Sequence, residues 1–360
     1  MSKKKILFQL NYLYHIPAVA PIIELFAEDD KYDVAFQISL DFEYKLGIFR
    51  KRIPQSNFNT YFPSNVRSVK QGDEFDVVFG TDVIDASKFR NALLCMVYHG
   101  PTFNKTVTYR ELRRHAENRY IIFVESRFTA NKLTESKSIG NSEMVVVGFP
   151  KLDPYLNNRY NQDTVLDELG LDSNKKTILY APTYKPTSIY DLYSEIFYAT
   201  QSHNLIIKLH HYSWMGKYAS RNQNRLFRKQ LDNFEHAILM PQDFYNIIPL
   251  YAAADTLISE ASGALIEFLI TEKMGIVYDL PDKDITRSNS ESLLSNNRDY
   301  LQDKFIHISS PQELQSAIDS ALNPNERQIE KIKDYKNKYF FKNDGKASER
   351  IKSYIDNLLL

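Results

Sequence analysis

The sequence predicts an α/β protein with two Rossmann-like domains whose parallel sheets face each other across a cleft. At 360 residues the chain exceeds the length at which a single hydrophobic core usually stops growing. Short apolar runs alternate with helical stretches in both halves of the chain, which is typical of parallel βαβ units. The stretch GFPKLDP, residues 148–154, interrupts this alternation and predicts a linker.

The apolar runs give the expected order of strands. In the first half we expect strands at residues 5–10, 33–38, 75–80, 93–97, 120–124 and 144–147. In the second half we expect them at residues 177–180, 205–209, 237–240, 256–258 and 275–278. The tail from residue 325 is charged and helical in pattern. We therefore predict a first domain over residues 1–153, a second over 154–335, and a C-terminal helix within 336–360.

Composition excludes several classes of protein. Lys plus Arg equals Asp plus Glu at 45 each, so no overall field steers the chain toward nucleic acid. The single cysteine, Cys95, cannot form an internal disulfide, which favours a reducing compartment and hence the cytoplasm. No run of about 18 apolar residues predicts a membrane span, and the N-terminus does not have the pattern of a signal peptide. The mixed basic and apolar run at residues 45–52 is open to two interpretations, a solvated face or contact with an anionic membrane surface.

Polar residues at the ends of the predicted strands indicate where a ligand binds, because open parallel sheets bind ligands outside the carboxyl ends of their strands. Groups suited to an anionic ligand follow four strands: His99 and Gly100; Thr183 and Lys185; Lys208 and His210; and Ser259, Ser262 and Gly263. Four such ends exceed what chance placement would give. The sequence therefore predicts an anion site, for which we expect nucleotide phosphates.

The segment SEASGALIEF, residues 259–268, has the pattern of a strand end, a small-residue turn and a helix start. Such a turn leaves hydroxyls and backbone N–H groups that can hold a phosphate. Glu267, one turn into the helix, is a candidate acceptor for ribose hydroxyls. The simpler interpretation is N-capping by Ser259 or Ser262 with a solvated Glu267.

The candidate histidines are also open to two interpretations each. Lys208 and His210 have the same parity, so both can lie on one face of the strand end and oppose phosphate charge. An ordinary strand edge would also fit. His99 ends a buried strand, where it is either a satisfied surface histidine or a functional imidazole. The eight histidines are scattered without metal-ligand spacing, and no P-loop or G-x-G-x-x-G motif occurs, so we predict no metal site.

Taken together, these segments resemble the CDP-glycerol glycerophosphotransferase family, the teichoic-acid-type polymerases and primases. YHGPT at residues 98–102 is similar to the family's Tyr/Trp-His-Gly-Thr-Pro, and GFPKLD at 148–153 resembles Gly-x-Pro-Arg-x-Asp. ILYAPTYK at 178–185 resembles Leu-Tyr-Ala-Pro-Thr-x-Arg, and KLH at 208–210 matches Lys-x-His-Pro without the proline. DGKASER at 344–350 is close to the family's C-terminal pattern. The matches follow the family's order from about residue 97 to 351.

The resemblance implies a GT-B fold in which the second domain holds a CDP-activated donor and the first faces the acceptor. It implies that His99 is the general base for an acceptor hydroxyl, a task that suits imidazole because its pKa lies near operating pH. His210, Ser262 and the helix start would hold the departing nucleotide phosphate. It also implies a C-terminal helix that crosses back to the first domain, and a polymer or lipid-linked acceptor in teichoic acid or capsule synthesis. We expect no required metal cofactor and a cytoplasmic protein, with peripheral membrane contact as an open alternative.

One departure keeps the donor open. The family usually has Ser/Thr-Asp-Tyr-Ser-Ser at the helix start, whereas this chain has SEASG at residues 259–263. That turn is closer to the Ser-Gly turn of GT-B proteins that use UDP-sugars. A UDP-sugar glycosyltransferase or epimerase, and a non-catalytic nucleotide-binding module, are therefore the competing hypotheses.

Overall fold

The structure is a computed structural model that describes residues 2–39, 42–45, 49–101, 106–215, 223–281 and 303–359. It divides into two compact units, which we describe separately. Unit 1 comprises Met1–Asn157 and Lys338–Leu360, and unit 2 comprises Asn158–Asn337. The division falls after residue 157 rather than 153, and the last residues belong to unit 1. That the two sheets face each other across a cleft stays a prediction.

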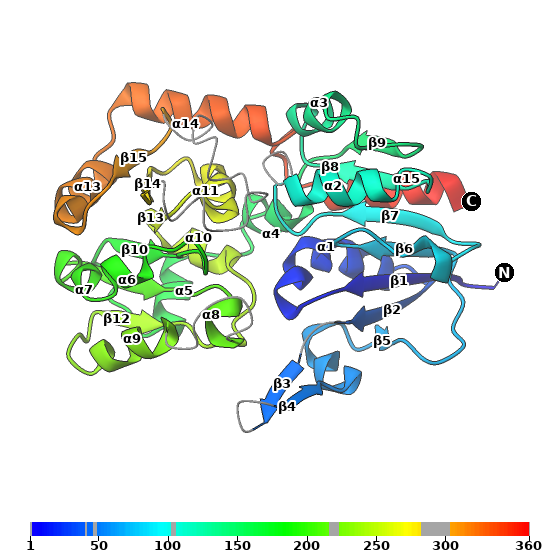
Figure 1. The fold of residues 1–360 in the computed structure, drawn as a ribbon, viewed down its shortest axis with the longest axis horizontal. Helices are drawn as coiled ribbons and strands as arrows, with labels where there is room; N and C mark the ends of the chain where they lie inside the picture. Colours follow the sequence, from blue (N-terminus) through cyan, green and yellow to red (C-terminus); the bar gives the residue numbers. More distant parts are fainter. Residues whose placement is uncertain are drawn as a thin grey trace. The chain divides into compact units, whose positions relative to one another are not determined.

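Unit 1 contains a seven-stranded sheet in the order β5-β2-β1-β6-β7-β8-β9, paired in parallel throughout (Figure 1). Its strands are β1 (Lys4–Leu10), β2 (Tyr32–Ile38), β5 (Arg67–Ser68), β6 (Val77–Gly80), β7 (Leu93–Val97), β8 (Ile121–Val124) and β9 (Glu143–Val146). Its helices are α1 (Ile16–Ala27), α2 (Thr106–Arg114), α3 (Arg127–Glu135), α4 (Asp153–Leu156) and α15 (Ala347–Leu359). A separate antiparallel hairpin joins β3 (Phe42–Lys45) to β4 (Phe49–Arg52).

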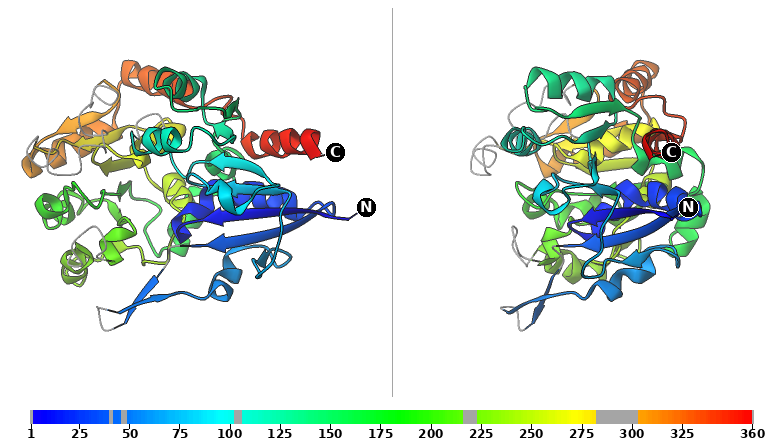
Figure 2. Two further views of the ribbon diagram at one scale, coloured as in Figure 1. Left: turned by 45° about the vertical axis from the view of Figure 1, so that its right-hand side comes forward. Right: turned by 90° about the vertical axis from the view of Figure 1, so that its right-hand side faces the viewer.

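Residues far apart in the sequence meet in unit 1. Helix α15 packs against α1, and Lys352 Nζ lies 2.8 Å from the Asp29 carboxylate that follows α1. The phenol of Tyr32 on β2 donates to Asp356 on α15. Figures 1 and 2 accordingly show both ends of the chain on the same side of unit 1. The C-terminal helix is therefore an integral layer of the first unit.

Unit 2 repeats the architecture with a six-stranded parallel sheet in the order β12-β11-β10-β13-β14-β15. Its strands are β10 (Thr177–Tyr180), β11 (Asn204–Ile207), β12 (Ala237–Leu239), β13 (Thr256–Ser259), β14 (Gly275–Tyr278) and β15 (Ile306–Ile308). Its helices are α5 (Gln162–Glu168), α6 (Ile189–Leu192), α7 (Glu195–Ala199), α8 (Tyr212–Met215), α9 (Gln223–Leu231), α10 (Ile248–Ala253), α11 (Gly263–Phe268), α13 (Leu314–Leu322) and most of α14 (Glu326–Tyr339).

The predicted α/β class with two parallel sheets is confirmed, and each predicted strand corresponds to a strand of the structure. Their interiors are apolar runs that the sheets bury on both faces; in β10 and β14 every residue is buried. The separate β3–β4 hairpin and the short edge strands β5 and β15 were not predicted. These elements contain polar residues, such as His307 in β15, so they lack the apolar run that marked the others.

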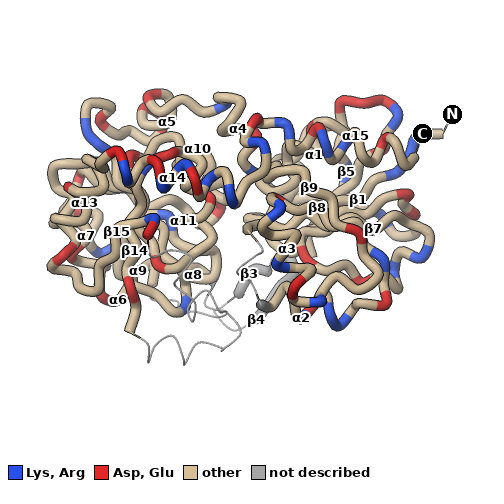
Figure 3. Tube along the Cα trace, turned by 90° about the horizontal axis from the view of Figure 1, so that it is seen from above, with Lys and Arg blue, Asp and Glu red and all other residues tan. Residues whose placement is uncertain are grey.

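Charge is spread evenly. Figure 3 shows Lys and Arg interspersed with Asp and Glu along both units, α14 among them. This agrees with the equal counts of acidic and basic residues. In the part of the chain that the structure describes, no helix has the length and apolar character needed to cross a membrane. The side chains of the basic run at residues 45–52 lie outside the described part.

Candidate active site

The strand order of unit 1 reverses between β1 and β6, because β2 and β5 continue from β1 on one side while β6 to β9 lie on the other. Ligands of open parallel sheets bind at such a switch point. The carboxyl ends of three adjacent strands meet there, and each delivers polar side chains. His15 follows β1, Thr81 and Asp82 follow β6, and His99 follows β7.

His99 is held by the neighbouring strand end. Its Nδ1 lies 3.3 Å from the backbone oxygen of Thr81 and 3.7 Å from the Asp82 carboxylate. A carbonyl oxygen can only accept, so Nδ1 carries the hydrogen and the neutral ring has its basic lone pair on Nε2. His99 is therefore arranged to accept a proton at Nε2.

A second histidine, which the sequence analysis did not single out, stacks on His99. The rings of His15 and His99 are nearly parallel, with centroids 4.0 Å apart and an interplanar angle of 11°. His15 Nδ1 lies 2.7 Å from the Thr81 hydroxyl and 3.8 Å from Asp82, so one strand end holds both imidazoles. His15 itself is buried.

His15 and Asp82 carry a signal that the sequence analysis overlooked. Both closely follow a predicted strand, and the strand-end rule that selected His99 selects them as well when applied to the first and third strands. Together with His99 they offer three ligand atoms within 4.8 Å of one another, a set that could receive a metal ion. Gly100 is buried beside His99, whereas the motif's Thr102 lies outside the described residues.

Unit 2 has its own switch point, between β10 and β13. There the Ser259 hydroxyl donates to the backbone oxygen of Ala181 (2.7 Å) and lies 2.9 Å from the Ser262 hydroxyl. Ser262 is the N-cap of α11 and accepts from the N–H of Leu265 at 3.4 Å. The capping interpretation of Ser262 is thus what the structure displays, and Gly263 begins the helix.

The loop after β10 touches the strand ends on both of its sides. On the β13 side, the N–H of Thr183 donates to the Glu260 carboxylate at 2.6 Å. On the β11 side, the ring of Tyr184 lies 4.6 Å from that of His210 and 4.9 Å from that of Tyr212. The loop therefore joins the Thr183 and His210 positions that the sequence predicted separately.

The other predicted residues of unit 2 vary in exposure. Lys185 is exposed, and Lys208 is half-buried with Nζ 3.1 Å from the backbone oxygen of Leu209. Ser259 is fully buried, and Glu267 is 3% exposed with its carboxylate accepting from the Tyr251 phenol at 3.0 Å. Glu267 is thus not the solvated residue of the simpler interpretation. Its contact with a ribose stays a prediction.

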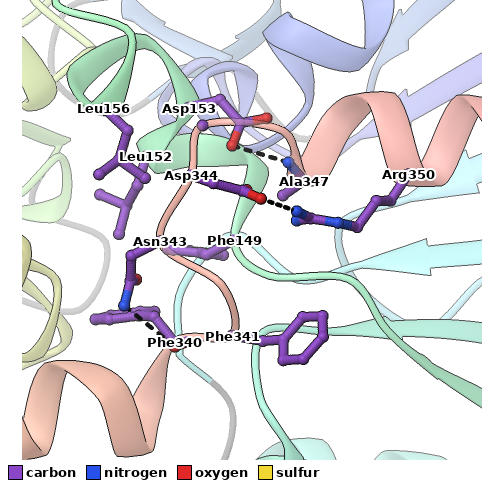
Figure 4. A pocket seen from close by; sticks show the side chains of 11 residues that line it. Phe149, Leu152, Asp153, Leu156, Phe340, Phe341, Asn343, Asp344, Ala347 and Arg350 are labelled. Atoms are coloured by element: carbon purple, nitrogen blue, oxygen red, sulfur yellow. Dashed lines mark hydrogen bonds and ion pairs between the residues drawn. The ribbon is translucent and has the colours of Figure 1, made fainter.

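Two of the motifs that carry the family resemblance lock together within unit 1 (Figure 4). Asp153 is 3% exposed and accepts from the N–H groups of Ala347 and Ser348 (3.1 and 2.7 Å) and from the Ser348 hydroxyl (2.6 Å). Burial raises the pKa of Asp153, and these bonds oppose that rise. Asp344 pairs with Arg350, whose Nη1 also donates to the backbone oxygen of Val147 at 2.9 Å. We call this arrangement the Asp153 clamp.

A small pocket lies beside the clamp, lined by Phe149, Leu156 and Phe340 among others. It contains none of the predicted site residues. A side chain at Gly345, which has φ +68°, would meet the Asn157 amide, so glycine is required at this turn. The clamp motifs therefore hold the C-terminal helix in place.

Two Rossmann-like units in one chain, each with polar side chains collected at the switch point of its sheet, define a GT-B-like α/β protein. The family model for CDP-glycerol:poly(glycerophosphate) glycerophosphotransferase matches residues 94–357. The chain belongs to this family. His99 and all the predicted site residues of unit 2 lie inside the matched range, whereas His15 and Asp82 precede it.

Known proteins agree with this assignment. The teichoic acid glycerol-phosphate primase of Bacillus subtilis (strain 168) is 26% identical over 243 residues, which are 66% of this chain and 57% of that protein. The chain spans 40–58% of the length of the curated relatives it matches.

Solved structures agree on the fold. A structure of the wall teichoic acid polymerase TagF superposes with a TM-score of 0.69 at 18% identity, covering 98% of this chain and 88% of that chain. The S. aureus MnaA–UDP structure gives 0.62 at 14% identity, covering 99% and 97%. At these identities the likeness establishes a GT-B-like fold.

Proposed function

We propose that this chain transfers a polyol phosphate from a CDP-activated donor, CDP-glycerol in the first place, to a hydroxyl acceptor in the synthesis of teichoic acid or a similar cell-surface polymer. The observation that carries the proposal is the state of His99. It lies at a switch point, inside the range matched by the family model, and its Nδ1–H is directed to a carbonyl so that Nε2 is the basic nitrogen.

In the proposed reaction His99 and Asp82 have separate roles. His99 Nε2 takes the proton of the acceptor hydroxyl while that oxygen attacks the β-phosphorus of the donor in line. The bond from the β-phosphorus to the bridging oxygen breaks, and CMP departs. Asp82 stabilises the imidazolium that forms, because its carboxylate lies 3.7 Å from Nδ1.

Unit 2 is proposed to hold the donor. Lys208 and Lys185 oppose the charge of the phosphates, and His210 stabilises the charge that develops on the departing phosphate. We assign the Thr183 hydroxyl and the turn of Ser262 and Gly263 to the same phosphates. Ser259 and Glu267 are both buried. We propose that Ser259 shapes the turn before α11 and that Glu267, on α11, accepts from the ribose hydroxyls of the donor.

A donor screen tests this function. CDP-glycerol should release CMP in the presence of a hydroxyl acceptor, CDP-ribitol should react more slowly, and UDP-sugars should remain intact. The Ser262-Gly263 turn favours a second candidate, a UDP-sugar glycosyltransferase or epimerase, in which His99 would act at carbon. Release or epimerisation of a UDP-sugar with CDP-glycerol intact would replace the proposal by that candidate.

We further propose that turnover does not require a divalent cation, because lysines, a histidine and the turn of α11 supply the charge on the donor side. Activity should persist after treatment with EDTA and extensive dialysis, measured as CMP release. The control is the same dialysed protein assayed with and without added Mg²⁺. Complete loss in chelator, restored by Mn²⁺ or Mg²⁺, would contradict this and direct attention to His15, Asp82 and His99 as ligands.

The acceptor is proposed to be a polymer or lipid-linked hydroxyl, with no role for nucleic acid. We place the reaction in the cytoplasm, where CDP-activated donors would be available, in peripheral contact with the inner face of the membrane. Binding of the chain to anionic vesicles, measured by sedimentation at low and high salt, tests the membrane part of this placement.

A further inference from the structure

The Glu260 carboxylate spans both ends of the loop that follows β10. Its Oε2 accepts from the N–H of Thr183 at 2.6 Å. Its Oε1 accepts from the N–H and the hydroxyl of Ser188, at 2.5 and 2.6 Å. One side chain from the turn after β13 therefore fixes Thr183, near the start of the loop, and Ser188, its last residue, which lie 77 and 72 positions away in sequence.

These hydrogen bonds offset the cost of burying the Glu260 carboxylate away from water. Glu260 is 3% exposed, and a buried carboxylate is costly unless hydrogen bonds or charges compensate it. Burial raises the pKa of Glu260, while the N–H and O–H donors of Thr183 and Ser188 favour the charged form. An ionised carboxylate only accepts hydrogen bonds, which suits a place where four donors converge: the N–H of Thr183, the N–H and hydroxyl of Ser188 and, at 3.5 Å, the hydroxyl of Thr187.

The loop between those ends carries candidate donor ligands. Thr183 and Lys185 lie on it, and between them Tyr184 contacts the ring of His210. The Thr183 hydroxyl donates to the backbone oxygen of Pro186 within the loop. Since β10 is the central strand of the site, with β11 on one side and β13 on the other, the placement of these groups relative to both neighbours depends on how the loop is anchored.

We propose that Glu260 is a positioning residue, which orders residues 183–188 so that Thr183 and Lys185 meet the phosphates of the nucleotide donor. The donor part of this inference rests on the proposed function. The ordering of the loop stands on the hydrogen bonds alone.

The test compares Glu260→Gln with Asp255→Asn. Glutamine keeps the size of the side chain but brings an N–H₂ group against N–H donors. Asp255 is a matched control, because its carboxylate likewise accepts from a backbone N–H, that of Thr177 at 2.9 Å, but at the amino ends of β10 and β13 rather than at their carboxyl ends. Hydrogen exchange without ligand and calorimetric binding of CDP are measured on both variants.

In Glu260→Gln, the amides in peptides covering residues 183–188 should lose protection, and the Kd for CDP should rise about tenfold or more, the loss of one charge-assisted contact. Asp255→Asn should keep the protection of residues 183–188 and the Kd for CDP, even if its melting temperature falls. Unchanged loop protection in Glu260→Gln would overturn the inference. A lowered melting temperature with an unchanged Kd would reduce Glu260 to a structural residue and overturn its donor part.

A double-mutant cycle with Lys185→Ala separates the two parts. If Glu260 acts through the loop, Lys185→Ala should weaken CDP binding in the wild type but have little further effect in Glu260→Gln. Additive losses would contradict action through the loop. If Glu260→Gln does not fold, Glu260→Asp keeps the charge with a shorter reach, and the same two measurements apply. A wild-type chain that binds no CDP would reject the proposed function, while the exchange data would still decide whether Glu260 orders the loop.

Discussion

Replacing His99 with alanine should lower kcat by about 10²–10⁴-fold, the usual contribution of a general base, while leaving the Kd for the donor nearly unchanged. The reason is that a base acts on the acceptor proton chiefly in the transition state, and His99 belongs to unit 1 rather than to the unit proposed to hold the nucleotide. Initial rates of CMP release and calorimetric titration with CDP give the two quantities.

The comparison with unit 2 makes this result specific. His210→Ala should weaken donor binding as well as turnover, because its contact with phosphate exists in the ground state too. Ser262→Ala should resemble it more mildly, since backbone donors remain at the turn. An inactive His99→Ala that still binds nucleotide also eliminates the non-catalytic hypothesis. Loss of nucleotide binding in His99→Ala together with normal binding and rate in His210→Ala would contradict these roles.

Replacing Asp153 with alanine should destabilise unit 1 by roughly 2–3 kcal/mol, because it leaves two N–H groups and a hydroxyl without their buried acceptor. The loss stays below the sum of three bonds, since removing the carboxylate also removes its desolvation cost. Asp153→Asn, which keeps one acceptor oxygen, should lose less. Urea unfolding followed by circular dichroism measures the change.

The chain offers an internal control for this experiment. Trp214, the single tryptophan, belongs to unit 2, so its fluorescence follows that unit while circular dichroism follows both. We expect the dichroism transition to move further than the fluorescence transition in Asp153→Ala. Asp232→Ala, at an exposed position, should leave both in place. An Asp153→Ala protein as stable as the wild type would show that the clamp is dispensable.

The sequence predicted every interior strand of both sheets but only one edge strand of each, β9 and β12. Buried parallel strands such as β7 and β10 are continuous apolar runs, a local signal that needs no knowledge of neighbours. The strand β5 is two residues long, and it exists only because Ala35 and Phe36 of β2 pair with it. Such tertiary pairing leaves no pattern in one segment.

The candidate site was predicted only where a local pattern marked it. His99 and His210 stood at the ends of recognisable strands. The stacking of His15 on His99, and the reach of Glu260 to Ser188, join positions 84 and 72 residues apart whose partners no spacing rule identifies. Asp153 was noticed within a family motif, but its function as an anchor for Ala347 and Ser348 required the fold.

Unit 1 is built from two segments that lie on either side of unit 2 in the sequence, and this has a consequence for biosynthesis. A ribosome delivers β1 through α4 first, but the helix α15 that packs on α1, and the N–H groups that Asp153 binds, come only after the whole of unit 2. Unit 2 is continuous in sequence and can close while translation proceeds. Until α15 is made, the surface of α1 that it covers stays uncovered, so the part of unit 1 that precedes unit 2 is completed only after unit 2. Nascent chains stalled before residue 338 should therefore be the ones that chaperones recognise.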